Sequence, residues 1–509
     1  MVMRVTSQTQ QRNALNNIFR ITENMFNAQK EITSGKKIQK PSDDPSGMRD
    51  TLALRTNIKQ IKQFDRNINN NQLFLSSGES ALDSIGVSLS RAKELSMVEL
   101  GGLSTSETRG YAKTELDNII SKVLQDANAK VKNMHIFSGT NVNTTPFELS
   151  ASGAVYIYKG NSENLMVQIE EDINVKVNIP GSEVLGTDLN PDLNTSTNVS
   201  DLNGGTGITA GSFFITDRAG TSGAITITSS MTLANVITAI DNVSSNLTAS
   251  INSSGNGITI RDTSSVIKNS LTVSEVDGGT TALSLGIVGT KDGNIEGMDL
   301  NAALSTNTKI SELNGGDGLT LGDIQIINGA TSGVVSLSSA TTIGGVIDLI
   351  NAAASGTVTA SIDSAGTSLQ VVSNNSSTIA VVNNVGTDTT AEELGIGGGR
   401  NVINTLFKLK QAMEYDDTFA ILGSLANLDS GLATINESRA IYGAVARRIM
   451  STEATHQQNI VDQKNQISNI EGADLVEAAS EFAAMEAALQ ASLSSTARII
   501  QPSLLDFLR

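Results

Sequence analysis

The chain has 509 residues with no Cys and no Trp, 12 Phe, 5 Tyr and a formal net charge of −17 at pH 7. The length predicts several domains, the missing Cys excludes disulfides and thiol chemistry, and the acidic balance argues against a nucleic-acid partner, because phosphate binding requires clustered Lys and Arg. No run of ~18 apolar residues and no apolar signal-peptide region occur, so we expect neither a membrane span nor a cleaved secretory signal.

The first predicted element is a helix near the N-terminus. Its apolar residues recur at alternating spacings of four and three, which places them on one face of a helix. This face consists of Ala14, Ile18, Ile21, Met25, Ala28 and Ile32. Such a stripe is typical of a coiled-coil seam, although packing within a single domain gives the same pattern.

The segment 33–49, TSGKKIQKPSDDPSGMR, is predicted to end the first helix and begin the second. Gly35 breaks the first helix. Asp44 is a suitable N-cap with Pro45 at the first helical position, because a carboxylate accepts the free amide hydrogens and Pro has none to lose. A metal site at Asp43 and Asp44 is the alternative, but capping accounts for both residues and no third ligand lies nearby in the sequence.

The second predicted helix, about 47 to 100, has the strongest pattern in the chain. Its apolar residues recur at seven-residue intervals, at Leu54, Ile61, Ile68, Leu75, Leu82 and Leu89. At ~1.5 Å per residue this helix would be roughly 80 Å long, which indicates a helical bundle and not a globular core. A further stripe over 112–127 follows a turn at 101–106 and predicts a shorter antiparallel partner.

The middle of the chain, 201–400, differs in composition from both ends. It holds 17 acidic and six basic residues, and Gly, Ser, Thr and Asn dominate, so this part accounts for most of the negative charge. Residues 200–290 and 311–400 resemble each other at an offset of about 110 residues, which indicates a duplicated module. Short alternating segments predict strands, with one helix per copy near 233–242 and 343–352.

Each copy also has a Gly-rich segment, GlyGlyThrGly at 204–207 and GlyGlyAspGly at 315–318. A phosphate-binding loop would need a following Lys-Ser or Lys-Thr, and a calcium-binding nonapeptide would have to recur in tandem. Neither condition is met, so we interpret both segments as tight turns.

The last predicted helix carries a second apolar stripe. Its residues are Leu475, Phe482, Leu489, Leu493 and Ile500. Marginal helices take their stability from tertiary partners. Because the two stripes lie at opposite ends of the chain, we expect the terminal helices to pair with each other and to pack against copies of the same or related chains.

No motif typical of an enzyme is present. The chain lacks a nucleophile elbow, a paired-His motif, a dinucleotide fingerprint and a coherent acidic cluster. Its two His, His135 and His456, are expected to be structural or solvated. We therefore predict no catalytic residues, no cofactor and no metal.

These patterns predict an α+β fold. A long antiparallel helical bundle and a terminal coiled coil are built from both chain ends, with a duplicated β-rich insert between them. The predicted domains are 1–45 plus 456–509 for the paired terminal helices, 46–185 plus 400–455 for the bundle with small β-hairpins, 186–290 for the first insert and 291–399 for the second.

Several motifs at the two ends resemble those of the flagellin family, and within it those of the hook–filament junction proteins. They are SGKKIQKPSDDPSG at 34–47, LSRAKELS at 89–96, HIFSGTNVNTTPF at 135–147 and a C-terminal segment that ends in SLLDFLR. The resemblance covers about 1–180 and 400–509, whereas the central module resembles the variable inserts of the family only weakly.

The resemblance implies a non-catalytic structural subunit of the bacterial flagellum, an adaptor ring that joins the hook-associated proteins to the filament. In this family the paired terminal helices form an inner tube, the next helices form an outer bundle, and the insert points outward. The first stripe would then meet Leu475, Phe482, Leu489 and Leu493, and the seam over 54–89 would pack against helices at 106–133 and 400–450.

The resemblance also implies partners and a location. The implied partners are copies of the chain in a ring, a neighbouring hook-associated protein, flagellin, and an export chaperone at the C-terminal helix. The implied location is extracellular, on the flagellum, after export by the flagellar type III apparatus without a cleaved signal peptide.

Two alternative functions stay open from the sequence. One is flagellin itself, the bulk filament subunit, which abundance in sheared filaments would distinguish from a scarce adaptor. The other is a carbohydrate- or surface-binding module in the insert at 190–400, for which exposure and polarity are the only support.

Overall fold

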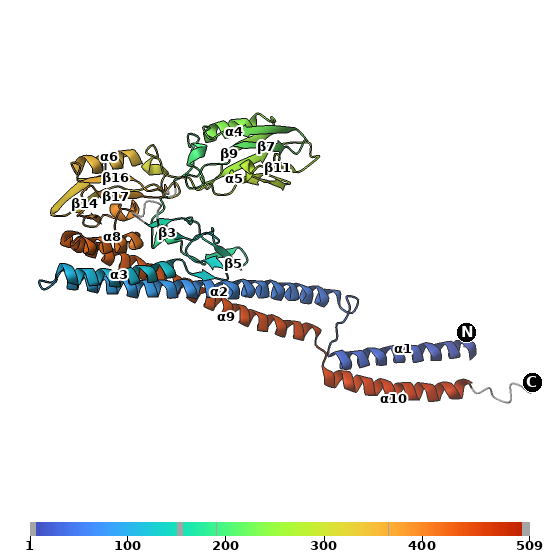
Figure 1. Cartoon of the computed structure of the whole chain (residues 1–509). Helices are drawn as coiled ribbons and strands as arrows, with labels where there is room; N and C mark the ends of the chain where they lie inside the picture. Colours follow the sequence, from blue (N-terminus) through green and yellow to red (C-terminus); the bar gives the residue numbers. More distant parts are fainter. Residues whose placement is uncertain (1–6, 150–155, 190, 365, 501–509) are drawn as a thin grey trace, which may run out of the picture. The chain divides into compact units, whose positions relative to one another are not determined.

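The computed structural model describes residues 7–149, 156–189, 191–364 and 366–500. Long helices lie at both ends of the chain and strands fill the middle, which confirms the predicted α+β fold (Figure 1). The chain divides into two compact units. The terminal unit comprises the described parts of Met1–Ile68, Gln168–Ile173 and Ile449–Arg509, and the main unit comprises those of Asn69–Val167 and Asn174–Arg448. This division does not test the four predicted domains, which stay a prediction.

Long helices form both ends of the chain, and short helices occur between the strands of its middle part. Their bounds in the described residues are α1 Ser7–Ser34, α2 Pro45–Glu99, α3 Ser106–Ala127, α4 Leu233–Asp241, α5 Thr281–Ser284, α6 Ile343–Ala353, α7 Thr390–Glu393, α8 Val402–Glu414, α9 Thr418–Glu471 and α10 Leu475–Ile500, with short 3-10 turns η1 Gly181–Glu183, η2 Val199–Asp201 and η3 Ile310–Glu312.

The strands fall into three groups. Small hairpins near the bundle are β1 Lys130–Val131, β2 Met134–His135, β3 Phe147–Leu149, β4 Tyr156–Tyr158, β5 Met166–Glu170 and β6 Ile173–Lys176. The first copy of the module contains β7 Gly211–Thr216, β8 Ser222–Ile227, β9 Leu247–Ile251, β10 Ile258–Asp262, β11 Leu271–Glu275, β12 Gly289–Lys291 and β13 Ile295–Glu296. The second contains β14 Asp323–Asn328, β15 Thr331–Ser336, β16 Val358–Ile362, β17 Leu369–Ser373 and β18 Ala380–Asn384.

The start of α2 follows the predicted capping. Asp44 Oδ1 accepts the backbone N–H groups of Ser46 and Gly47, both at 3.0 Å, and Pro45 is the first helical residue. These hydrogen bonds lower the pKa of Asp44, because they stabilise its charged form. Capping therefore accounts for Asp44 without a metal.

In the main unit, α2, α3, α8 and α9 build a helical bundle. The predicted stripe of α3 is buried, at Ala112, Leu116, Ile119, Val123 and Ala127, and α3 packs against α8. One close approach joins α2 to α9, because a Cβ built on Gly78 would lie 2.7 Å from the Tyr442 hydroxyl. The absence of a side chain at Gly78 thus lets Tyr442 reach the bundle interior.

Helix α9 contains a window long and apolar enough to cross a membrane by length and composition alone, with a mean hydropathy of 1.2. The sequence predicted no membrane span, because polar residues interrupt this window and no run of ~18 apolar residues occurs in it. Its large apolar residues Ile421, Leu428 and Ile435 are all fully buried in the main unit. This burial is typical of the core helix of a bundle.

The two copies of the central module share one topology. The sheet order β8-β7-β11 in the first copy matches β15-β14-β18 in the second, and the pair β9-β10 matches β16-β17. Helices α4 and α6 occupy equivalent places, within a few residues of the two predicted positions. The duplication seen in the sequence is therefore a duplication of fold.

The Gly-rich segments are turns, as predicted. Gly204, Gly205 and Gly207 have positive φ, and so do their counterparts at 315, 316 and 318. Each turn leads from a 3-10 turn toward the first strand of its copy, which requires backbone angles that Gly adopts without strain.

Each copy has its own apolar core. The core of the first copy draws on residues from Leu193 to Leu300. The core of the second spans Leu304 to Ile396 and also includes Leu189, which precedes the first copy in the sequence. The N–H of Leu189 donates to the carbonyl of Thr367 at 2.8 Å. The first copy is thus inserted into the chain of the second.

Candidate assembly interface

Helices α1 and α10 lie side by side in the terminal unit (Figure 1). On α1 the burial follows the predicted stripe. Ala28 is buried, the other stripe residues Ala14, Ile18, Ile21, Met25 and Ile32 are half-buried, and every other side chain between Arg12 and Lys30 is exposed. The stripe therefore faces α10.

On α10 the predicted face needs correction. Phe482 and Leu489 are half-buried, but Leu475 and Leu493 are each 52% exposed, and the side chain of Ile500 lies outside the described residues. The more buried positions lie on one face of the helix, at Ala478, Phe482, Met485, Ala488, Leu489, Ser492 and Thr496. The prediction chose the large residue Leu493, whereas the helical repeat selects its small neighbour Ser492.

The terminal unit has further apolar side chains outside this seam. Phe19 and Phe26 on α1 are 70% and 59% exposed, and Val476 on α10 is 80% exposed. Leu475 and Leu493 add to this exposed set. Single apolar residues on a surface are ordinary, but several large ones on one pair of helices indicate a surface that a partner covers.

Glu471 joins the chain segments that enter and leave this helix pair. Its buried carboxylate accepts hydrogen bonds from Lys36 Nζ at 2.9 Å and Arg55 Nη2 at 2.6 Å. Its backbone carbonyl accepts the N–H of Lys37 at 2.7 Å. Burial by itself would raise the pKa of Glu471, but the hydrogen bonds and the two cations lower it below the ordinary value. The ends of α1 and α9 are therefore fixed together by a charged carboxylate.

Part of the predicted seam of α2 lies in the terminal unit, where α2 packs against α9. Ile61 and Ile68 are buried and Leu54 is half-buried, and Ile61 belongs to a small core with Ile460. His456 is 3% exposed, and its Nδ1 lies 2.7 Å from Asp65 Oδ1. Of the two predicted roles for His456, the structure favours the structural one.

The rest of the seam lies in the main unit. Leu75 is 3% exposed, and Leu82 and Leu89 are fully buried. Ion pairs flank the seam, with Arg439 Nη2 lying 2.8 Å from Asp83 Oδ1 and Arg91 Nε lying 2.6 Å from Glu115 Oε1. These seam residues form the interior of the bundle within one chain.

His135, the other His, is also a core residue. Its ring is 2% exposed, and Nδ1 lies 3.1 Å from the Asn128 carbonyl oxygen. Burial lowers the pKa of His135, because a charged ring loses its hydration. Within the described ranges, no group of three or more His, Asp, Glu or Cys side chains could hold a metal ion.

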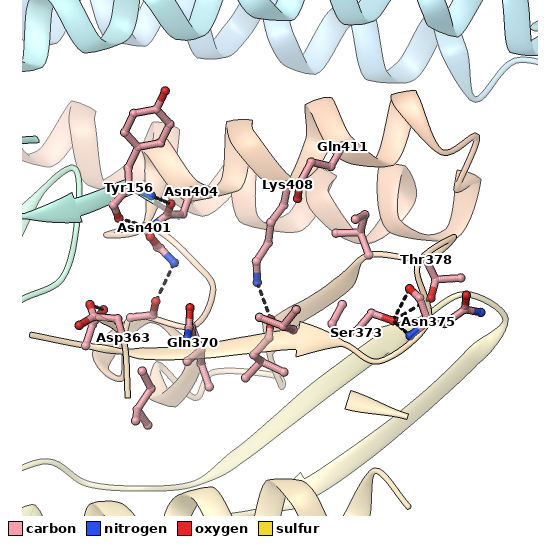
Figure 2. A pocket seen from close by; sticks show the side chains of 18 of the residues that line it. Tyr156, Asp363, Gln370, Ser373, Asn375, Thr378, Asn401, Asn404, Lys408 and Gln411 are labelled. Carbon is pink, nitrogen blue, oxygen red and sulfur yellow. Dashed lines mark hydrogen bonds between the residues drawn. The ribbon is translucent and has the colours of Figure 1, made fainter. Parts of the chain in front are cut away.

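A cavity of about 200 Å³ lies between β17 and α8 in the main unit. Figure 2 shows Lys408 of α8 pointing across it toward β17, where its Nζ lies 3.5 Å from the Val371 carbonyl oxygen. Desolvation lowers the pKa of Lys408 to about 8. The sequence patterns did not predict this site, because α8 contains a second lysine, Lys410, only two residues away and nothing local distinguishes the two.

Comparison with known proteins identifies the two ends of the chain. The model of the bacterial flagellin N-terminal helical region matches residues 5–142, and that of the bacterial flagellin C-terminal helical region matches residues 425–508.

Individual relatives match only part of this chain. The flagellar filament 30.7 kDa core protein of Treponema maltophilum is 29% identical over 126 residues, which are 25% of this chain and 42% of the relative. The flagellar filament 41 kDa core protein of Borreliella burgdorferi is 26% identical over 178 residues, 32% of this chain and 52% of the relative. The chain thus spans about half the length of these relatives or less.

Among solved structures, flagellar hook associated protein-3 of Legionella pneumophila aligns over 82% of this chain and 98% of its own, with 14% identity and a TM-score of 0.39. The matched helical regions contain α1, α2 and α3 at one end and most of α9 with α10 at the other. The chain therefore carries, at its two ends, the N- and C-terminal helical regions of the bacterial flagellin family.

Proposed function

We propose that this protein is a non-catalytic structural subunit of the bacterial flagellum that assembles through its terminal helices. The observation that carries the proposal is the α1–α10 pair, which has an apolar seam between its helices and exposed Phe19, Phe26 and Val476 outside that seam. An isolated pair with this surface gains stability when further copies cover the exposed side chains. The flagellin-type helical regions at both ends support the same assignment.

Within the flagellum, we propose the role of an adaptor ring that joins the hook-associated proteins to the filament. The support is the PSDDP motif at 41–45 and the ending SLLDFLR at 503–509, of which the latter lies outside the described residues. The proposed partners are copies of the chain in a ring, a hook-associated protein on one side and flagellin on the other, with a chaperone at the C-terminal helix before type III export to the cell exterior.

A deletion strain tests the adaptor role. Cells without the gene should build hooks but release flagellin into the medium, because the filament lacks its attachment ring. Expression of the gene from a plasmid should restore attached filaments. A deletion strain that keeps its filaments and swims normally would contradict the adaptor role.

Flagellin is the second candidate, and one observation favours it. The two relatives described above are filament core proteins by name. Quantitative mass spectrometry of sheared filaments separates the two roles. A bulk filament subunit would dominate the preparation, whereas an adaptor ring would contribute a minor fraction that does not grow with filament length.

A further inference from the structure

Equivalent strands of the two copies of the module can be compared residue by residue. Ile258 of β10 pairs with Ile251 of β9, and Leu369 of β17 pairs with Ile362 of β16 at the equivalent position. Along an antiparallel strand the backbone groups of alternate residues point to opposite edges. In the second copy, the N–H of Asp363 donates to the carbonyl of Ser368, so the backbone groups of Ser368 point toward β16. By alternation, those of Gln370 and Val372 also point toward β16, whereas those of Leu369 and Val371 point to the opposite edge of β17.

In the first copy, a third strand covers that edge. Strand β13 pairs with β10, with Ile295 opposite Ile260 and Glu296 opposite Thr259. The N–H of Gly297 continues the ladder by donating to the Ile258 carbonyl at 2.9 Å. The Thr259 hydroxyl donates to the Glu296 carboxylate. The first copy thus places a short acidic strand at this edge.

In the second copy, no described strand occupies the equivalent place. Strand β17 pairs with β16 alone in its sheet. Leu369 and Val371 are both 2% exposed, so their outward backbone groups are buried, and one of them, the Val371 carbonyl, accepts a long hydrogen bond from Lys408. Buried backbone groups are costly to leave without good partners. The cavity of about 200 Å³ lies along this edge, and Asn404, Lys408 and Gln411 of α8 are part of its opposite wall (Figure 2).

The wall of this cavity contains a cation, Lys408, and also the carboxylate of Asp363, whose oxygens accept hydrogen bonds from Thr367 and Ser368. Lys408 Nζ donates to the Val371 carbonyl. Desolvation is the cause of its lowered pKa, about 8. Across the cavity, Gln370 Oε1 is buried and has no hydrogen-bond partner among the described residues. Gln370 is the counterpart of Thr259, whose side chain contacts Glu296 in the first copy.

We propose that this cavity binds a short extended peptide with an acidic side chain, which adds to β17 as a third antiparallel strand in the place that β13 takes in the first copy. The peptide backbone satisfies Leu369 and Val371, and its carboxylate pairs with Lys408. Strand addition of this kind takes affinity from the main chain and specificity from side-chain pockets.

The test uses the full chain and a synthetic peptide with the sequence of residues 293–299, GNIEGMD, labelled with a fluorophore. Fluorescence anisotropy should show saturable binding. Binding should weaken at least tenfold for Lys408→Met and for a peptide with Gln in place of Glu. The matched control is Lys410→Met on the same helix, because Lys410 pairs with Asp117 at 2.7 Å, and it should bind as the wild type does.

A second peptide tests strand addition without changing the protein. Methylation of the backbone nitrogen of the second Gly removes the N–H that Gly297 uses in the first copy, and this change should also weaken binding at least tenfold. Absence of saturable binding at millimolar peptide, equal binding to Lys408→Met, or equal binding of the methylated peptide would each overturn the proposal. Absence of saturable binding would mean that water alone occupies the cavity.

Discussion

Glu471 connects the end of α9 to the segment that follows α1 and to α2 in the terminal unit. Glu471→Gln removes the charge that Lys36 and Arg55 share, so we expect the free energy of unfolding to fall by about 1–2 kcal/mol, a modest value because both cations keep access to solvent. Chemical denaturation followed by circular dichroism measures this loss. Glu477→Gln, on the exposed surface of α10, is the control and should change stability little.

The same carboxylate predicts a pH dependence. The pKa of Glu471 is lowered on folding, so the folded state binds fewer protons than the unfolded state in the acidic range. Its stabilising contribution is complete above the ordinary value of 4.5 and is lost as the pH falls below that value through the folded pKa. The stability difference between wild type and Glu471→Gln should therefore shrink on acidification. A difference that stays constant down to pH 3 would contradict the ion-paired joint.

Lys408 predicts that the stability of the fold depends on pH in the opposite sense, since this residue destabilises the folded state when it is charged. Its pKa falls from 10.5 to about 8 on folding, so the unfolded chain holds the proton more tightly and this group destabilises the fold at neutral pH. Tyr156, Tyr415 and Asp363 are the other titratable groups that line the same cavity, and desolvation is the cause of the lowered pKa of Lys408. Lys408→Met should raise Tm at pH 7, and the gain should diminish as the pH rises from 8 to 10.5. A lower Tm at pH 7 would contradict the desolvated environment.

At the scale of elements, the close contact between Gly78 of α2 and Tyr442 of α9 predicts how substitution of Gly78 changes stability. Gly78→Ala places a methyl group 2.7 Å from the Tyr442 hydroxyl, so we expect a loss of about 1–3 kcal/mol in the free energy of unfolding. Gly110 lies on α3 with open space around it, so Gly110→Ala should instead stabilise by about 0.5–1 kcal/mol. If urea denaturation gives both variants the same sign, the close packing at Gly78 is wrong.

The terminal helix pair can be tested with one added charge. Leu489→Asp places a carboxylate in the seam between α10 and α1, where burying it without a partner is costly. We expect this variant to fail to join flagella while the central module stays folded. Gln490→Glu adds the same charge at the exposed neighbouring position and should assemble normally. Normal assembly of Leu489→Asp, scored by immunoblot of purified flagella, would contradict the pairing.

The elements also show what the sequence alone could predict. The stripe on α1 was predictable because every buried or half-buried position between Arg12 and Lys30 is apolar. The face of α10 was not, because small residues such as Ser492 carry no apolar signal and the larger Leu493 beside them does. The edge of β17 could not be predicted, because it depends on a strand that the second copy lacks. Glu471 and Lys408 were missed since their partners lie far away in the sequence.

At the scale of the whole molecule, the nested arrangement of the two copies predicts which part can be removed. The second copy takes Leu189 and Leu304 into one core on either side of the first copy. Replacement of residues 193–300 by a flexible linker should therefore leave the rest folded and able to assemble. A soluble variant with native helical content and normal incorporation is the expected result. Loss of folding would show that the second copy needs the first.

We propose above that this chain is a structural subunit at the hook–filament junction and that it assembles through its paired ends. Immunogold electron microscopy of intact flagella, with antibodies against residues 201–300 of the central module, tests this proposal most directly. We predict gold particles in one cluster at the base of each filament. Label along the whole filament would assign the chain to the filament itself, and flagella without label on cells that express the protein would contradict the account.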